Sequence, residues 1–287
     1  MGQTSKRRPK GCLLLWYPLC METSVFIGKC IYCGGTGQTN EHLISKSLGG
    51  KYLLRKASCE KCREITSKWE LNPLRDNWLE ARAALNYPSS HRDFDKETFP
   101  IKVTLKDGSE KILSLKKDEL FGLASFLEYP LPGFFSGISY DNGSLITGTR
   151  LIGFGSNYKD TIQKYNIKEI SHSVTYKGTH FERMIIRMAY CGAIATWGEG
   201  CFEECYALPV IMGTKENVGY LMGCDPSGKI VPIIGRVVGD NAIKMGIFQK
   251  KDDENIYAIA RLKFFSASDA PEYVVILGTL KKDRILK

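Results

Sequence analysis

Two pairs of cysteines are the residues whose type and spacing most directly indicate chemistry in this chain. Cys30 and Cys33 form one Cys-x-x-Cys pair, and Cys59 and Cys62 form a second pair further along. Four thiolates are the soft ligands that hold a structural zinc ion in tetrahedral geometry. Such a zinc ion has no open coordination position, so we expect it to stabilise the fold rather than take part in catalysis. The alternative is a set of unrelated free thiols.

The tripeptide Asn40-Glu41-His42 lies between the two cysteine pairs. The Glu41 carboxylate could hold a divalent metal ion, which would neutralise charge on a phosphate and stabilise the leaving oxygen. His42 could take a proton from water, because the pKa of histidine lies near neutral pH. A Glu-His dipeptide carries little information by itself, and its position between two zinc-binding pairs makes it a specific candidate for phosphodiester hydrolysis.

Basic residues are concentrated around these candidates. The chain has a net charge of +9, and between Leu43 and Arg63 six basic residues accompany one acidic residue, Glu60. This local excess suits a polyanion such as nucleic acid, although a solvated loop rich in lysine would look similar. We therefore take as candidate phosphate contacts Lys46, Lys51, Arg55 and Lys56.

Taken together, these motifs resemble the HNH endonucleases, in particular their four-cysteine branch. The resemblance covers about residues 28–87 and is carried by four segments: Cys30-x-x-Cys33, Thr39-Asn-Glu-His-Leu-Ile44, Ser47-Leu-Gly-Gly50 and Ala57-Ser-Cys-Glu-Lys-Cys62. It implies a ββα-metal fold, in which a β-hairpin and a helix enclose a catalytic metal ion, usually magnesium. It also implies that His42 is the general base and that Glu41 binds the catalytic metal.

One position departs from the family pattern. The family normally places Asn or His directly after the last zinc cysteine, and this chain has Arg63. A guanidinium group cannot bind a cation, but it could contact the phosphate. The missing ligand could come from the same face of the following helix, where Glu70 is the only carboxylate beside Thr66 and Ser67. Related HNH sequences favour Glu70 as the ligand, and a solvent-facing role is the alternative.

The surrounding pattern predicts the elements that position these residues. We expect a short β-ribbon over Thr39–Ser47 that is closed by the Leu48-Gly49-Gly50 turn. A helix should then run from Cys59 through Glu70, and a second helix should start after Pro73, which ends the first. The polar segment that starts at Pro88 reads as a linker.

Beyond residue 98 the pattern becomes rich in β-strands. Asp107-Gly108 between two alternating segments predicts a hairpin over residues 101–115. Further strands are expected at 167–176, 229–238, 242–248, 256–265 and 273–280, and helices at 117–126, 159–165 and 180–196. The helix that includes Phe181–Tyr190 faintly resembles a downstream helix of uncharacterised HNH proteins, although its spacing fits simple core packing. We expect His172 and His180 to be structural.

These observations predict an α+β protein with three parts. Residues 1–27 would be a flexible tail, with a secretory signal as the less favoured interpretation. Residues 28–97 would be the zinc-bound HNH module and its linker, and residues 98–287 a larger β-rich α+β domain that selects or regulates the target. The remaining cysteines fit buried thiols in a reducing cytoplasm, and no apolar segment is long enough to span a membrane.

The predicted function is cleavage of DNA, with RNA not excluded, using structural Zn²⁺ and catalytic Mg²⁺ or another divalent metal. Two alternatives remain open at this point. One is a catalytically impaired zinc module that binds nucleic acid, with Arg63 marking the loss of the metal site. The other is a nuclease that is gated by a ligand-sensing C-terminal domain. The sequence does not fix the oligomeric state.

Overall fold

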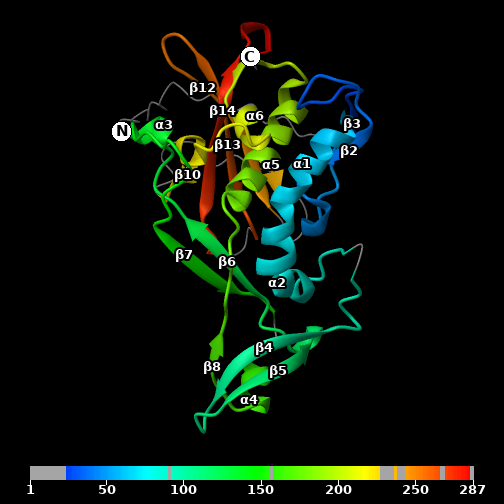
Figure 1. The fold of residues 1–287 in the computed structure, drawn as a ribbon, viewed down its shortest axis with the longest axis vertical. Coiled ribbons are helices and arrows are strands. Elements are labelled where there is room, and N and C mark those ends of the chain that lie inside the picture. The colour runs from blue at the N-terminus through cyan, green and yellow to red at the C-terminus, as the bar shows by residue number, and fades with distance from the viewer. Residues whose placement is uncertain are drawn as a thin grey trace, which may run out of the picture.

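The computed structural model describes residues 24–89, 92–155, 158–226, 236–237, 243–265 and 269–284. The chain is a mixed α+β protein with several small sheets. A long helix at its centre separates an N-terminal unit from the largest sheet (Figure 1). None of the helices in the described ranges has the length and apolar character that a membrane crossing requires.

The N-terminal unit consists of a three-stranded sheet followed by a helix. Strand β3 (Leu53–Ser58) lies between β1 (Ser24–Phe26), which is parallel to it, and β2 (Thr39–His42), which is antiparallel. Helix α1 (Glu60–Leu71) begins directly after β3. The chain order β2, β3, α1 is therefore that of a ββα unit. Residues 24–26 were expected to belong to a flexible tail, and that boundary is wrong; the preceding 1–23 lie outside the described residues.

The turn between β2 and β3 occurs at the predicted glycines. Gly49 has a positive φ of 79°, and a Cβ atom on Gly50 would lie 1.8 Å from the carbonyl oxygen of Ile44. Both positions therefore require glycine. The predicted ribbon is too long, however, because the strand ends at His42 and Lys46–Leu48 forms a 3₁₀ turn, η1. The Ser45 carbonyl accepts hydrogen bonds from Leu48 and Gly50, which bends the chain at this point.

Helix α1 continues into a wider turn rather than ending abruptly at Pro73. Residues Asn72–Asn77 form a π-helical segment, η2, and α2 (Leu79–Ala84) follows. Pro73 has no N–H to donate, but its carbonyl accepts a hydrogen bond from Trp78, five residues on. The Trp78 ring is fully buried, and its indole N–H donates to the Ser125 carbonyl at 2.7 Å. The segment thus anchors the N-terminal unit on the rest of the molecule.

The largest sheet is antiparallel and lies behind the central helix. Its order is β10-β14-β13-β12-β11, and β9 also pairs with β14. The strands are β9 (Phe202–Cys205), β10 (Met222–Cys224), β11 (Arg236–Val237), β12 (Lys244–Lys251), β13 (Ile256–Lys263) and β14 (Glu272–Leu280). The strands expected at 256–265 and 273–280 are confirmed, although the first ends at Lys263, and the strand expected at 242–248 is confirmed from Lys244 on, with residue 242 outside the described residues. Of the strand expected at 229–238, residues 229–235 and 238 lie outside the described residues.

The central helix α5 (His180–Trp197) is buried along nearly its whole length. It contacts β12, β13 and β14 on one side and α1, η2 and β2 on the other. One hydrophobic core therefore extends from the N-terminal unit through α5 into the large sheet. The short helix α6 (Ala207–Ile211) packs against it, and α7 (Val218–Leu221) contacts β10 and β14.

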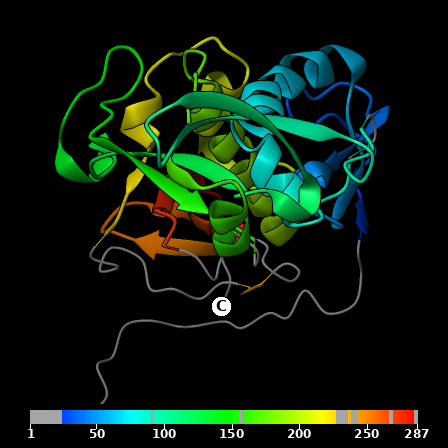
Figure 2. The same cartoon turned by 90° about the horizontal axis from the view of Figure 1, so that it is seen from below.

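A smaller sheet with its own hydrophobic core projects from this body. Strands β4 (Thr98–Leu105), β5 (Glu110–Lys116) and β8 (Ile167–Ser171) form it, and α4 (Tyr158–Lys164) covers it. It lies at the far end of the long axis in Figure 1 and nearest the viewer in Figure 2. The hairpin predicted around Asp107-Gly108 is confirmed, and the strand predicted to reach residue 176 ends at Ser171.

The helix predicted over residues 117–126 is wrong. Lys117–Glu119 forms only a 3₁₀ turn, η3, and β6 (Leu123–Glu128) follows and pairs with β7 (Gly148–Gly153). Gly122 explains the difference, because its φ is +53° and a Cβ there would lie 2.5 Å from the Phe154 carbonyl oxygen. A close approach of two backbone segments at this glycine favours sheet pairing over a helix. The remaining short elements are α3 (Gly133–Ser136) and η4 (Lys282–Arg284).

Candidate functional site

The four predicted cysteines meet at one point of the N-terminal unit. Their sulfur atoms all lie within 4.8 Å of one another, as a metal ion bound by four thiolates requires. Cys30 and Cys33 come from a tight turn in which the Gly34 N–H donates to the Cys30 carbonyl at 2.9 Å. Cys59 caps helix α1 and Cys62 lies in its first turn. The cluster could hold a metal ion such as zinc, and it joins the turn to the start of the helix.

One of these thiols, Cys59, has a lowered pKa. A hydrogen bond from the backbone of Cys62 to the Cys59 sulfur lowers the pKa of Cys59 to about 7. The thiolate is the form that binds a metal, so Cys59 is the ligand that ionises most readily, whereas burial raises the pKa of Cys62.

Glu41 and Glu70 converge on one cation from different elements. Glu41 extends from β2 and Glu70 from the last turn of α1, and both carboxylates contact the guanidinium group of Arg187 on α5. The Arg187 Nη1 lies 2.9 Å from Glu41 Oε2, and its Nη2 contacts Glu70 Oε1. The Ser45 hydroxyl donates to the other oxygen of Glu70 at 3.1 Å. Glu70 therefore faces the same guanidinium as Glu41, and its role as a metal ligand stays a prediction.

The carboxylate of Glu41 is deeply buried. Its side chain is 7% exposed, and burial raises the pKa of Glu41 while the nearby positive charge of Arg187 opposes that shift. The hydroxyl groups of Ser58 and Tyr32 also stabilise the ionised form. Burial therefore makes the charged form of Glu41 less favourable than in water, and Arg187, Ser58 and Tyr32 offset part of that cost.

His42 lies at the edge of the same site. It is half-buried, and burial lowers the pKa of His42, whereas the Glu70 carboxylate opposes this shift. The lowered pKa keeps the imidazole neutral near pH 7, which is the form that accepts a proton. The backbone carbonyl of His42 also accepts a hydrogen bond from Arg187 at 3.4 Å.

An irregularity in the β2–β3 pairing sets the position of these two residues. The register shifts between Thr39 and Glu41, and the Asn40 side chain accepts a hydrogen bond from the Lys56 backbone at 3.0 Å. Lys56 itself adopts a positive φ of 53°. Such bulges bend a strand and reorient its side chains. Here the bulge directly precedes the Glu41-His42 dipeptide.

The predicted basic residues lie on the surface of the N-terminal unit. Lys46, Lys51, Arg55 and Lys56 are all exposed. The Lys56 ammonium donates to the Gln38 carbonyl at 2.8 Å, and the Arg55 guanidinium lies 5.9 Å from the centre of the exposed Phe26 ring. These residues can contact phosphates without the rearrangement of a buried group.

Arg63 lies apart from the two carboxylates. It is exposed and forms an ion pair of 2.6 Å with Glu60 one turn earlier on α1. The guanidinium group that contacts Glu41 and Glu70 comes from Arg187, a residue that the sequence reasoning did not select. The available signal was the presence of two arginines, Arg183 and Arg187, four residues apart in a largely apolar helix.

The other histidines with a described environment have structural surroundings. The His180 ring packs edge-on against Trp69, with 5.1 Å between ring centres. The His172 Nδ1 lies 3.8 Å from Glu80 Oε2 on α2. Neither contact belongs to the Glu41–Glu70 site.

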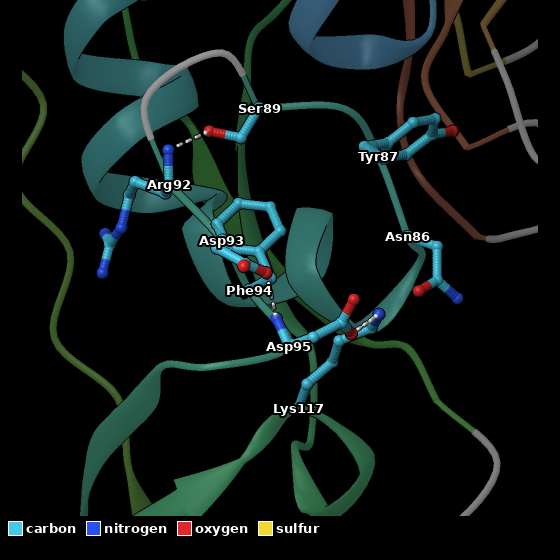
Figure 3. A pocket seen from close by; sticks show the side chains of 8 residues that line it. All are labelled: Asn86, Tyr87, Ser89, Arg92, Asp93, Phe94, Asp95 and Lys117. Atoms are coloured by element: carbon cyan, nitrogen blue, oxygen red, sulfur yellow. Dashed lines mark hydrogen bonds and ion pairs between the residues drawn. The ribbon is translucent and has the colours of Figure 1, made fainter.

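An open pocket of about 320 Å³ occurs elsewhere on the surface. Figure 3 shows it where the chain leaves α2. The Lys117 ammonium donates a hydrogen bond to the Asp95 carboxylate in its lining. Its lining contains none of the predicted site residues: Asn86, Tyr87, Ser89, Arg92, Asp93, Phe94, Asp95 and Lys117.

Comparison with known proteins yields no further support for a family. No protein family model, no curated protein and no solved structure matches this chain. The assignment of a function therefore depends on the geometry and chemistry of the site.

Proposed function

We propose that this chain is a metal-dependent endonuclease of the HNH type that hydrolyses phosphodiester bonds of DNA. The observation that carries the proposal is the convergence of Glu41 and Glu70 beside His42, in a ββα unit that is braced by four thiols. The resemblance of the motifs to the HNH family supports the same assignment.

The donor set suits a hard divalent cation. Two carboxylates from different elements approach a single point, which already holds the positive charge of Arg187. Carboxylate oxygens are the ligands that Mg²⁺ prefers. A divalent ion bound to Glu41 and Glu70 would neutralise charge on the scissile phosphate and stabilise the leaving oxygen.

The protein's own residues supply the other functions. The neutral imidazole of His42 would accept a proton from the attacking water. Lys46, Lys51, Arg55 and Lys56 would hold the phosphate backbone by charge, and Ser45 would orient the Glu70 carboxylate through its hydrogen bond. The four-thiol cluster would fix the start of α1 relative to the strands.

A second candidate is a zinc-bound module that binds nucleic acid without cutting it. Arg187 favours this candidate, because it contacts the carboxylates that a catalytic metal would need. Under this alternative the chain would bind DNA and leave it intact under all divalent-metal conditions.

Cleavage of supercoiled plasmid in the presence of Mg²⁺ tests the proposal. We expect the parent protein to cut and a chelator to stop it. His42→Ala should lower the rate by about 100-fold or more while zinc content and DNA affinity stay near parental values. His172→Ala is the matched control and should keep its rate. A His42→Ala protein that cuts as fast as the parent would remove His42 from the mechanism.

A further inference from the structure

Arg187 differs from the other arginine on the buried face of α5. Arg183, one turn earlier, is satisfied throughout: its Nε donates to Thr179, its Nη1 to the Val210 carbonyl, and its Nη2 to the Lys215 carbonyl. It also forms an ion pair with Glu216 and lies over the Trp69 ring. Such saturation is typical of a structural arginine.

The Arg187 side chain is satisfied only where it meets the site. Its two terminal nitrogens contact Glu41, Glu70 and the His42 carbonyl, whereas its buried Nε has no hydrogen-bond partner among the described residues. The side chain is 5% exposed, so water compensates little for the missing bond. Arg187 is therefore held mainly by attraction to the two carboxylates.

Two carboxyl groups share a single guanidinium at this point. The guanidinium group of an arginine such as Arg187 stays protonated in proteins. Glu70 is also the more accessible partner, with a side chain that is 22% exposed against 7% for Glu41. A cation could therefore reach the group from the side of Glu70.

From this geometry we infer that Arg187 is the resident cation of the Glu41–Glu70 pair and competes with divalent metal for it. This inference rests on the proposed function, which assigns the pair to the catalytic metal. Helix α5 would thereby control metal loading of the N-terminal unit through one side chain. Metal would bind tightly only when the guanidinium leaves the carboxylates.

Binding of Mn²⁺ to the zinc-loaded protein tests the inference without any cleavage. Free Mn²⁺ is measured by electron paramagnetic resonance during titration of the parent and of Arg187→Met, which removes the charge and keeps an unbranched side chain. We expect the variant to bind Mn²⁺ at least about tenfold more tightly, since a competing charge has been removed. Glu70→Gln added to Arg187→Met should abolish the gain.

Equal Mn²⁺ affinity in the parent and in a folded Arg187→Met would overturn the inference. If the variant folds poorly, its thermal unfolding is compared in Mn²⁺ and in metal-free buffer. Mn²⁺ should raise the unfolding temperature, because the ion would pair with the two carboxylates that have lost Arg187. Titration of the parent alone also tests the inference. If the parent already binds Mn²⁺ tightly and Glu70→Gln removes that binding, Arg187 does not compete with the metal. A variant that binds Mn²⁺ and yet cuts no DNA would support the inference and contradict the nuclease proposal.

Discussion

Glu41 and His42 are neighbours in the sequence, yet their surroundings suit them to different tasks. Glu41 is buried among Arg187, Ser58 and Tyr32, and these donors stabilise its negative charge. His42 is half-buried, and burial keeps its imidazole neutral. In the proposed mechanism Glu41 would bind the metal ion and the neutral imidazole of His42 would accept the proton from water.

The exposed lysines near His42 give a prediction at the same scale. Replacing Lys46 and Lys51 by glutamine should weaken DNA binding about equally for all sequences, because phosphate contacts carry no base information. The slope of log affinity against log salt concentration should fall in magnitude by about 2. Fluorescence anisotropy at several salt concentrations measures both quantities.

Lys168→Gln, on the projecting strand β8, is the control for charge alone. A double lysine variant whose salt dependence equals that of the parent would place the DNA elsewhere on the molecule.

Single residues differed in how well the sequence identified them. The cysteines could be selected from ligand chemistry, and the structure brings their four sulfur atoms together. Glu70 was selected from helical spacing and the family resemblance, and the structure places it against Arg187. Arg187 could not be assigned to the site from the sequence, because its contact with Glu41 joins residues 146 positions apart. Such contacts depend on tertiary packing, which local patterns do not encode.

At the scale of elements, the four-thiol cluster links the turn at Cys30 to the start of α1. We expect the purified protein to contain one tightly bound zinc ion per chain, and Cys59→Ala to lose it. Because the Tyr190 hydroxyl on α5 donates to the Ile31 carbonyl at 2.6 Å, the loss should also weaken the docking of the turn on α5. Elemental analysis and thermal unfolding measure the two effects.

Cys205→Ala is the control, since this half-buried thiol lies outside the cluster. Protein expressed with ample zinc that contains none would contradict the assignment of the site.

The contact between α2 and the segment after β8 predicts a pH effect on stability. Burial raises the pKa of Glu80 to about 7, so the folded state binds a proton more tightly than the unfolded state does. The stability that this proton contributes is complete below the unfolded pKa of about 4.3 and is lost as pH rises through about 7. Glu80→Gln removes this dependence.

Relative to the parent, Glu80→Gln should therefore gain about 3 kcal/mol in free energy of unfolding between pH 4.5 and pH 8. Urea unfolding at the two pH values measures the difference. If the two proteins show the same pH dependence, the Glu80 carboxyl is not the group responsible.

The elements themselves were predictable where the local signal was strong. The hairpin at Asp107-Gly108 follows from turn chemistry, and helix α5 from a largely apolar pattern. The prediction of a helix at 117–126 was wrong, because the positive φ of Gly122 and its close contact with Phe154 favour a strand. Short edge strands such as β9 and β10 were missed, since their pairing with β14 is non-local.

At the scale of the whole molecule, α5 connects the proposed catalytic unit to the large sheet. It contacts α1, η2 and β2 on one side and three strands on the other. The hydrophobic core is continuous through it. A change in the packing of α5 would therefore move Arg187 relative to Glu41 and Glu70, which gives the C-terminal half a physical route to the site.

The central claim is that Glu41 and Glu70 form the metal-binding part of a DNA-cleaving centre. Single-turnover cleavage of supercoiled plasmid in Mg²⁺ by the parent, Glu70→Gln and Glu60→Gln tests it most directly. Both substitutions remove one carboxylate from α1, but the Glu60 carboxylate only pairs with exposed Arg63. We predict that Glu70→Gln lowers the rate by about 100-fold or more and that Glu60→Gln cuts nearly as fast as the parent. A Glu70→Gln protein that cuts at the parental rate, or a parent that leaves the plasmid intact, would contradict the claim.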